Sequence, residues 1–291
     1  MTLPSTDTVV SYPSGAVSGT GIVVHIEDLG GGRSAVLLDA TPCHPVDAGW
    51  PDQGPDRATL RWNGSSASVV DCVVAATDGS ALYLGSDVPV RKGTEGWAFV
   101  VAHLVEGTAP AVGDEVAVEV DEDHRRSLSI GHTGCHLVSL ALNRALADRW
   151  TKEAAADALG APDFDKLAID SSTIVPFGSV DTFRLNKSLR RKGFVSDGLA
   201  DALPAIETAV NSTIEAWLAT HAAVSIRREG EALTDRRYWE CELPDGEASI
   251  ACGGTHAQSL DALGVLRAAL ALSDDEGTSV LTMTTEARGA H

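Results

Sequence analysis

The sequence predicts an α+β protein of two domains, with a β-barrel-like N-terminal domain over residues 1–121 and an α+β domain over residues 122–291. Short runs of Val, Ile, Leu and aromatic residues, separated by turn residues, fill the first part of the chain. Helical periodicity begins only beyond Asp121. The length of 291 residues suits two ordinary domains, and a hydrophobic content of 44% is ample for their cores.

Seven strands are expected in the N-terminal domain. Turn signals such as Asn63-Gly64 and Asp78-Gly79 separate them at the spacing of a sandwich or small barrel. The expected strands cover residues 20–27, 33–40, 58–62, 66–75, 81–85, 96–103 and 115–120.

The second domain is expected to contain two main helices and several strands. Leu137, Leu140, Ala141 and Leu146 recur at helical spacing within residues 132–150. Another apolar stripe follows residues 197–221, where Pro204 predicts a break or a late helix start. Strands are expected at residues 182–186, 223–228, 238–243, 248–252, 265–272 and 279–285.

Two short cassettes offer metal ligands: His132-Thr133-Gly134-Cys135-His136 and Cys252-Gly253-Gly254-Thr255-His256. On a helix, His132 and His136 emerge one turn apart from the same face. The two glycines between Cys252 and His256 allow a sharp turn that brings thiolate and imidazole together. Each pair alone is more simply explained by packing or solvation, but together they favour a zinc centre.

A set of four protein ligands does not by itself say whether the zinc is structural or catalytic. A closed tetrahedral set is typical of structural zinc, whereas a catalytic zinc keeps one position open. The metal is therefore structural, expands its coordination, or has one loose ligand.

The two cassettes resemble the HTATH and CGGTH motifs of alanyl-tRNA synthetase editing domains and of free-standing AlaX-type trans-editing proteins. HTGCH matches the first motif with two changes, and CGGTH matches the second completely. Three further segments resemble family motifs. Residues 120–126 resemble a V-D-x-x-x-R-R-like segment, and Gly178-Ser179 with residues 183–186 resembles the G-S…R-F-D-F segment. Residues 205–214, which include Asn211, resemble the I-E-x-x-V-N helix. The resemblance covers essentially the whole chain and implies a translation-protein-like barrel followed by an editing domain.

The resemblance implies zinc-dependent hydrolysis, in trans, of serine or glycine from mischarged alanine tRNA. It makes His132, His136, Cys252 and His256 the Zn²⁺ ligands, and His132, Thr133 and His136 the catalytic residues. A threonine hydroxyl can recognise serine by hydrogen bonding and leave alanine poorly held. The alternative role of Thr133 is to cap a backbone N–H near the start of a helix.

Three departures from the family pattern affect specificity and the surroundings of the site. The segment His44–Asp52 stands in place of Y-P-x-G-G-G-Q-P-x-D and loses most of its glycines and the glutamine. Residues 151–176 look like an insertion with an extra helix within residues 152–159. Cys135 replaces a threonine, either as a packing residue or as a redox-sensitive thiol.

The charge distribution limits how the chain can contact RNA. A net charge of -19 repels a polyanion, so tRNA binding needs a local basic patch. The best candidate for contact with RNA phosphates is a group of five cations: Arg184, Lys187, Arg190, Arg191 and Lys192. The alternative is that these residues form a solvated loop whose charges balance nearby acidic residues.

Composition favours a cytoplasmic protein with no membrane association. Five cysteines, an odd number in a long chain, indicate reduced thiols. Neither an export signal nor a run of eighteen apolar residues is evident. Two other functions are considered beside the editing reaction: hydrolysis or acyl transfer of another aminoacyl ester, and zinc-stabilised, non-catalytic binding of tRNA or a protein partner. The oligomeric state is left open.

Overall fold

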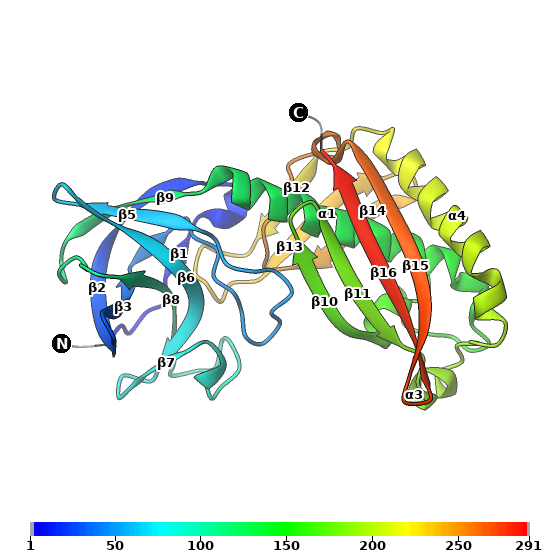
Figure 1. The fold of residues 1–291 in the computed structure, drawn as a ribbon, viewed down its shortest axis with the longest axis horizontal. Helices are drawn as coiled ribbons and strands as arrows, with labels where there is room; N and C mark the ends of the chain where they lie inside the picture. The colour runs from blue at the N-terminus through cyan, green and yellow to red at the C-terminus, as the bar shows by residue number, and fades with distance from the viewer. Residues whose placement is uncertain (1–2, 290–291) are drawn as a thin grey trace. The chain divides into compact units, whose positions relative to one another are not determined.

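The computed structural model describes residues 3–289 and has the predicted α+β class, with a closed β-barrel followed by helices and antiparallel sheets (Figure 1). The chain forms two compact units. The first extends to Arg126 and adds Ile226–Arg237 and Cys252–Thr255, while the second takes Ser127–Ser225, Tyr238–Ala251 and the chain from His256 onward. The domain boundary expected after residue 121 stays a prediction. Residues 1–2 and 290–291, at the outer ends of the predicted domains, lie outside the described residues.

The barrel is a ring of six antiparallel strands. They are neighbours in the order β5-β9-β2-β3-β8-β6, and pairing between β5 and β6 closes the ring. All seven strands expected in this part of the chain are present, and the seventh, β7 (Leu82–Leu84), extends the sheet beyond β6. The ring strands are β2 (Ser18–Gly30), β3 (Arg33–Leu38), β5 (Ala58–Trp62), β6 (Ser65–Thr77), β8 (Ala98–Glu106) and β9 (Glu115–Val120).

Alternation of side chains along these strands fills the barrel. In β5 and β9 every second residue is buried, so Leu60, Val116 and Val118 have no exposed surface. Val36, Leu38 and the aromatic ring of Phe99 belong to the same hydrophobic cluster. The barrel is therefore a packed core rather than an open channel.

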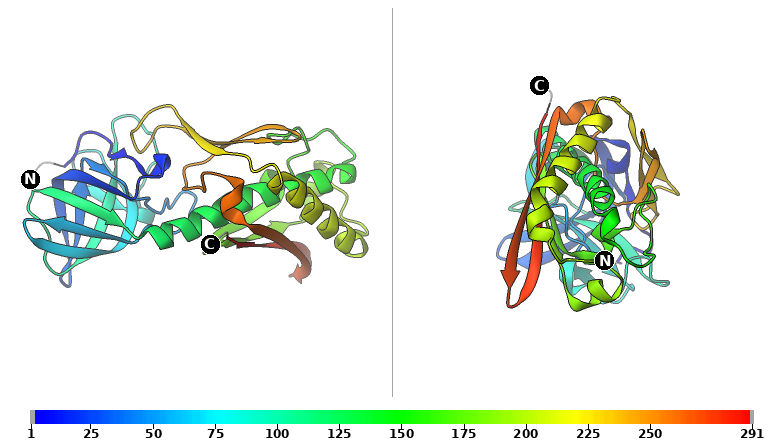
Figure 2. Two further views of the ribbon diagram at one scale, coloured as in Figure 1. Left: turned by 90° about the horizontal axis from the view of Figure 1, so that it is seen from above. Right: turned by 90° about the vertical axis from the view of Figure 1, so that its right-hand side faces the viewer.

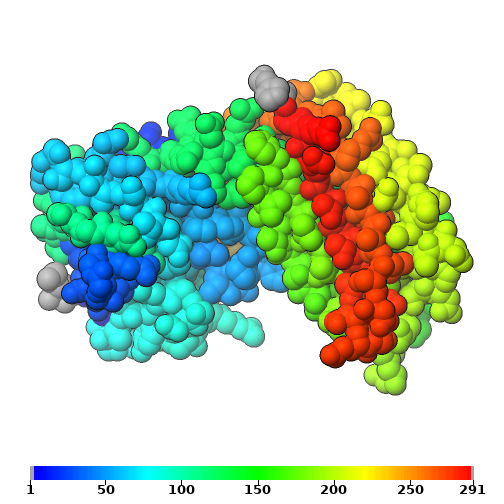
Figure 3. Space-filling view, viewed as in Figure 1, coloured from blue at the N-terminus to red at the C-terminus, as the bar shows by residue number. Residues whose placement is uncertain are grey.

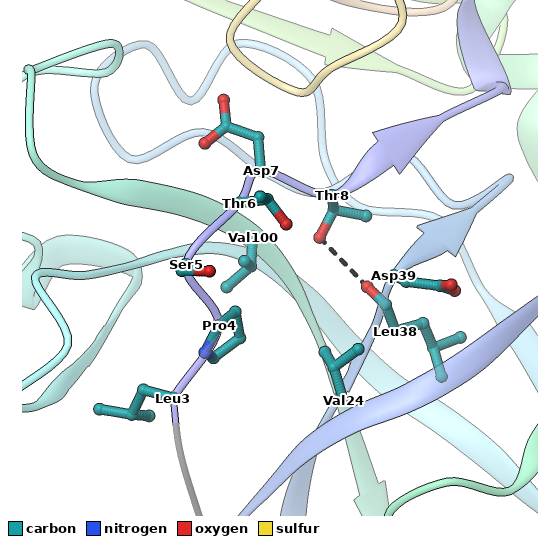
Figure 4. Close-up of a pocket in the computed structure, with 10 residues that line it drawn as sticks. All are labelled: Leu3, Pro4, Ser5, Thr6, Asp7, Thr8, Val24, Leu38, Asp39 and Val100. Carbon is teal, nitrogen blue, oxygen red and sulfur yellow. Dashed lines mark hydrogen bonds between the residues drawn. The ribbon is translucent and has the colours of Figure 1, made fainter.

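The N-terminal segment lies against this barrel and is held by hydrogen bonds. β1 (Val9–Val10) pairs in parallel with β4 (Ala40–Thr41). A pocket of about 250 Å³ opens beside the segment (Figure 4), where the Thr8 hydroxyl donates to the Leu38 carbonyl at 3.3 Å. None of the residues predicted for the metal site or for RNA contact lines this pocket.

A buried ion pair joins the end of the barrel to the first turn of α1 (Glu122–Ala145). Arg125 and Asp56 are only 4% and 2% exposed. Arg125 Nε donates to Asp56 Oδ1 at 2.7 Å, and its Nη2 donates to the other carboxylate oxygen and to the Pro42 carbonyl, the latter at 2.8 Å. The same carboxylate accepts the His44 backbone N–H at 2.5 Å. These bonds satisfy the two buried charges, as burial of an ion pair requires.

Helix α1 begins earlier than the sequence pattern predicted. The expectation was a helix over residues 132–150, but α1 covers Glu122–Ala145 and is followed by the short 3-10 helix Ala147–Arg149. Asp121 caps the start, because its carboxylate accepts the His124 N–H at 3.0 Å. Glu122 and Asp123 add the acidic first turn that the helix dipole favours. The first metal cassette therefore lies inside a helix and not at its start.

The second unit contains a four-stranded antiparallel sheet, and α1 and α4 (Leu199–Leu218) lie on one face of it, as the right-hand view of Figure 2 shows. Asn211 of α4 links helix and sheet, since its Nδ2 donates to the Ala268 carbonyl at 2.8 Å and its Oδ1 accepts the Ala268 N–H at 2.9 Å. Figure 3 shows β15 and β16 at the surface on the other face, where Ala269 and Thr284 are exposed. The strand order is β10 (Ile169–Val175), β11 (Gly178–Arg184), β16 (Thr278–Arg288) and β15 (Val265–Asp275).

Two further expectations for this part of the chain were wrong. Residues 152–159 form no helix, and the supposed insertion instead contains α2 (Phe164–Ala168) and strand β10. Pro204 does not break or delay α4, which runs through it from Leu199. Pro204 lies in the second turn of α4, where its missing N–H removes one intrahelical bond and the rest of the helix continues. The later strands appear as predicted: β12 (Val224–Arg228), β13 (Arg237–Leu243) and β14 (Gly246–Ala251) form a three-stranded sheet.

Within residues 3–289, no helix combines the length and the apolar character that crossing a membrane requires.

Buried carboxyl groups lie beneath α1 in the second unit. Asp181 is 1% exposed and accepts hydrogen bonds from Ser172 at 2.6 Å and Ser179 at 2.8 Å. Asp165 of α2 accepts the Ser139 hydroxyl at 3.0 Å. Burial, reinforced by the charge of Asp181, raises the pKa of Asp165 to about 7. At pH values between the ordinary pKa of an aspartate and about 7, Asp165 is therefore protonated in the folded protein and ionised in the unfolded chain.

We expect Asp165→Asn to flatten the pH dependence of stability. Because the folded pKa is raised, the proton on Asp165 contributes stability that is present at acidic pH and lost as the pH rises through about 7. The amide should therefore increase the free energy of unfolding above pH 7 by roughly 1–3 kcal/mol. Urea unfolding between pH 5 and 8 measures the effect, and Asp148→Asn, at an exposed position, is the control.

We expect Arg125→Met to lower the free energy of unfolding by about 3–5 kcal/mol, because it leaves the buried Asp56 charge uncompensated. Arg61→Met is the matched control: Arg61 pairs with Glu119 at 2.7 Å, but both side chains are more than half exposed. That change should cost less than about 1 kcal/mol. Equal losses in urea unfolding contradict the role given to the buried pair.

Candidate metal centre

Helix α1 carries the first cassette at a place where its backbone lies close to the sheet. A Cβ atom at Gly131 would meet the carbonyl oxygens of Gly178 and Val175 at 2.5 and 2.6 Å, and one at Gly134 would meet Leu266 at 2.9 Å. Glycine lowers helix stability, so its presence here reflects this close approach. On the same helix the rings of His132 and His136 lie with centroids 4.9 Å apart.

The second cassette follows strand β14. The Cys252 N–H donates to the Arg237 carbonyl at 3.0 Å, and the Ala257 N–H lies 3.3 Å from the Ser129 carbonyl on α1. The second bond brings the His256 ring beside the helix, with centroids 4.3 Å from His132 and 5.0 Å from His136. The structure thus brings His256 beside two imidazoles that lie more than a hundred residues earlier in the sequence.

His132, His136, Cys252 and His256 can hold a metal ion. Each offers one ligand atom, and these atoms all lie within 4.8 Å of one another. His132 is buried and the other three are partly buried. The donor set of imidazole nitrogens and one thiol suits a borderline divalent ion.

The state of these side chains agrees with a metal site. His136 Nε2 is buried without a hydrogen-bond partner, a costly arrangement that a metal bond would resolve. Burial lowers the pKa of His136 to about 4, so its imidazole is neutral and able to coordinate at neutral pH. Burial also raises the pKa of the Cys252 thiol to about 12, so metal binding would have to displace its proton.

Thr133 connects the two cassettes. It has no exposed surface, and its hydroxyl oxygen accepts the Ala257 N–H at 3.0 Å and lies 3.3 Å from His256 Nδ1. This contact orients the ring through Nδ1. The expected alternative, a cap near a helix start, is wrong because α1 begins at Glu122. Recognition of serine by Thr133 stays a prediction.

Gln53 is a residue near the second cassette that the motifs did not predict. The segment His44–Asp52 lacks the family's glutamine, but Gln53 and Asp56 directly beyond it have the spacing of the Q-P-x-D part of that motif. Gln53 is 2% exposed, its Nε2 donates to the Thr255 hydroxyl at 2.8 Å, and its Oε1 accepts the Thr255 N–H at 2.9 Å. Its side chain therefore fixes the conformation of the second cassette.

The predicted RNA-binding residues lie at the end of β11, on α3 (Lys187–Arg191) and directly after α3. Lys187, Arg190, Arg191 and Lys192 are exposed. Arg184 is paired with acids, 3.0 Å from Asp275 and 3.9 Å from Asp170. Of the five residues, Arg184 is thus partly neutralised within its own unit, and RNA contact stays a prediction for all five. Cys135 packs in the interior with its thiol 3.6 Å from Asp181, as a packing residue does.

Comparison with known proteins agrees with the motifs. No protein-family model matches the chain. The chain is similar to the alanine–tRNA ligase of Pyrobaculum neutrophilum, 28% identical over 247 residues that cover 80% of this chain and 22% of that protein. It is also similar to the alanine–tRNA ligase of Frankia alni, 28% identical over 275 residues that cover 91% of this chain and 25% of the relative.

A more local match has higher identity. The alanine–tRNA ligase of Methanopyrus kandleri is 32% identical over 117 residues, which are 40% of this chain and 10% of that protein. These relatives confirm the resemblance to alanyl-tRNA synthetases. The chain spans about a fifth to a quarter of the length of the first two relatives, 22% and 25%.

We expect Thr133→Val to weaken Zn²⁺ binding by roughly 10–100-fold, because residues that orient a metal-binding histidine affect affinity on this scale. Thr133→Ser keeps the hydroxyl and should bind nearly as tightly as the parent chain. Competition with a chromogenic chelator measures the affinities. Equal affinities for the valine and serine variants would exclude an orienting role for the hydroxyl.

Proposed function

We propose that this chain is a zinc-dependent deacylase that hydrolyses serine or glycine from mischarged alanine tRNA, acting in trans in the cytoplasm. The observation that carries the proposal is the convergence of His132, His136, Cys252 and His256 from two cassettes of the editing-motif type. Similarity to proteins named alanine–tRNA ligase supports an activity on charged alanine tRNA.

The chemistry requires little from the protein beyond the metal site. Zn²⁺, when bound, polarises an ester carbonyl and promotes ionisation of a water molecule. The three histidines and Cys252 would hold the ion, and Thr133 would orient the His256 ring through its contact with Nδ1. Gln53 would hold the turn between Cys252 and His256 in a fixed conformation through its two hydrogen bonds to Thr255.

Selectivity against alanine is the second task of such a site. The Thr133 hydroxyl is our candidate for recognising the serine side chain, because a site that pairs with a substrate hydroxyl discriminates against substrates that lack it. Because the hydroxyl oxygen accepts the Ala257 N–H, its contact with a serine substrate would be made by donating its proton to the serine oxygen. The exposed cations on α3 would contact tRNA phosphates.

A panel of charged tRNAs tests the proposal. We expect this chain to release serine and glycine from alanine tRNA, to leave alanyl-tRNA intact, and to lose activity with a chelator. His136→Ala should reduce the rate more than 100-fold, as removal of a metal ligand in a catalytic centre does. His221→Ala, at an exposed position, is the matched control and should change nothing.

Each other outcome has a defined meaning. Failure to hydrolyse any charged tRNA would refute the proposal and favour a non-catalytic binding protein. Release of a different amino acid would favour another aminoacyl ester as substrate. If His136→Ala loses metal but keeps its turnover, the ion has a structural role.

A further inference from the structure

Two arginines and a candidate metal ligand form one row across the three-stranded sheet. The Cys252 N–H donates to the Arg237 carbonyl at 3.0 Å, so these two residues lie opposite each other. The Glu229 N–H donates to the Arg236 carbonyl at 3.0 Å, just beyond the ends of β12 and β13. This bond sets Arg228, the last residue of β12, opposite Arg237, the first residue of β13. Neighbouring strands lie about 4.8 Å apart, so the backbone of Arg228 is roughly 10 Å from that of Cys252.

The side chains of this row share the face of the sheet that carries metal ligands. Residues directly opposite each other on neighbouring strands point to the same face, and so do alternate residues of one strand. Arg228, Arg237 and Cys252 therefore point to the same face as Trp239 of β13. The centroid of the Trp239 ring lies 5.3 Å from that of His136, another of the candidate ligands.

Neither arginine has a counter-charge. Arg237 is 4% exposed; its Nη1 and Nη2 donate to the carbonyls of Leu233 at 3.2 Å and Ala232 at 2.6 Å, and its Nε is buried without a partner. Arg228 is exposed, and within residues 3–289 no carboxylate forms an ion pair with either arginine. A guanidinium stays charged when it is buried, and a buried charge without a partner is costly. The row therefore favours an anion beside it.

The expected substrate brings an anion to this place. In a charged tRNA the aminoacyl ester and the last phosphodiester are attached to the same terminal ribose. A site for that phosphate must therefore lie within one sugar of the ester that the metal would polarise. The chain as a whole carries a net charge of -19, so the phosphate needs local cations. The planar fork of an arginine matches the geometry of phosphate oxygens.

We infer that Arg228 and Arg237 form a subsite for the terminal phosphodiester of the charged tRNA. Arg228 contacts the phosphate, and Arg237 attracts it through its buried and uncompensated charge. This inference rests on the proposed deacylase function and adds to it a phosphate subsite separate from the cations of α3. The subsite holds the end of the RNA so that its ester faces the metal ligands.

Hydrolysis of two substrates with the same ester tests the inference. One is seryl-tRNA made on alanine tRNA, and the other is 3′-O-seryladenosine, which has no phosphate. Arg228→Gln should lower kcat/KM for seryl-tRNA by about tenfold and change that for seryladenosine by less than about twofold. On seryl-tRNA the slope of log kcat/KM against log salt concentration should also become shallower by about 0.7, the value for one phosphate contact on a single strand. Arg237→Gln should likewise affect seryl-tRNA alone.

Arg236→Gln is the matched control. It removes an exposed arginine of the same hairpin whose position, one residue from Arg237, directs its side chain to the other face of the sheet. Both rates should stay unchanged in this variant. Circular dichroism and zinc content show whether each variant is folded and loaded, and Arg228→Gln decides alone if the buried substitution at Arg237 prevents folding.

Three results of the kinetic test would overturn the inference. Equal loss on both substrates in Arg228→Gln indicates a merely structural role. An unchanged rate on seryl-tRNA in that variant shows that Arg228 does not bind the phosphate. The same loss in Arg236→Gln as in Arg228→Gln indicates general attraction of RNA and no defined subsite.

A binding measurement separates this inference from the proposed function. Calorimetry with 3′-serylamido-adenosine, with and without a 5′-phosphate, reports recognition without hydrolysis. If the parent chain hydrolyses no charged tRNA, the proposed function fails. Tighter binding of the phosphorylated compound that Arg228→Gln abolishes would still support the subsite, and equal or absent binding of the two compounds would refute it.

Discussion

The ion pair between Arg125 and Asp56 is the constraint on which the arrangement of the first unit depends. It joins the first turn of α1 to the loop that ends at Asp56, and it ties both to the Pro42 carbonyl. The same loop carries Gln53, which holds Thr255 of the second cassette. One buried charge pair thus fixes where the helix starts and anchors the loop that shapes the Cys252 turn. Removal of either partner of such a pair would leave the other charge buried and uncompensated.

Two glycines allow α1 to lie close to the sheet, at some cost to the stability of the helix. Gly131 and Gly134 let α1 lie against Gly178 and Leu266 without a side chain between them. The adjacent histidines are consequently held on a rigid element, and His256 reaches them through the Ala257 contact with Thr133. Gly134 of the first cassette therefore serves the close packing of α1, whereas the three histidines and Cys252 are the candidate metal ligands.

Patterns that are local in sequence could be predicted, and contacts between distant residues could not. The barrel strands follow from alternation, and the metal ligands follow from i, i+4 spacing within each cassette. The start of α1 was missed because the helix was predicted from the apolar spacing of residues 137–146, whereas the Asp121 cap begins it at a polar stretch. Strand β10 was missed because four consecutive polar residues, Asp170 to Thr173, fill its centre. Gln53 was missed because its partner lies 202 residues further along the chain.

The composition of the first unit has a consequence for synthesis on the ribosome. Its last pieces come from late in the chain: the Val10 N–H donates to the Glu231 carbonyl, the Leu233 N–H donates to the Thr8 carbonyl, and Gln53 bonds with Thr255. When residue 126 leaves the exit tunnel, the six barrel strands are complete but these partners do not yet exist. The nascent barrel therefore lacks these contacts until residue 255 has been made. Domains generally fold as units during translation, but the first unit is completed only after most of the second unit has been synthesised.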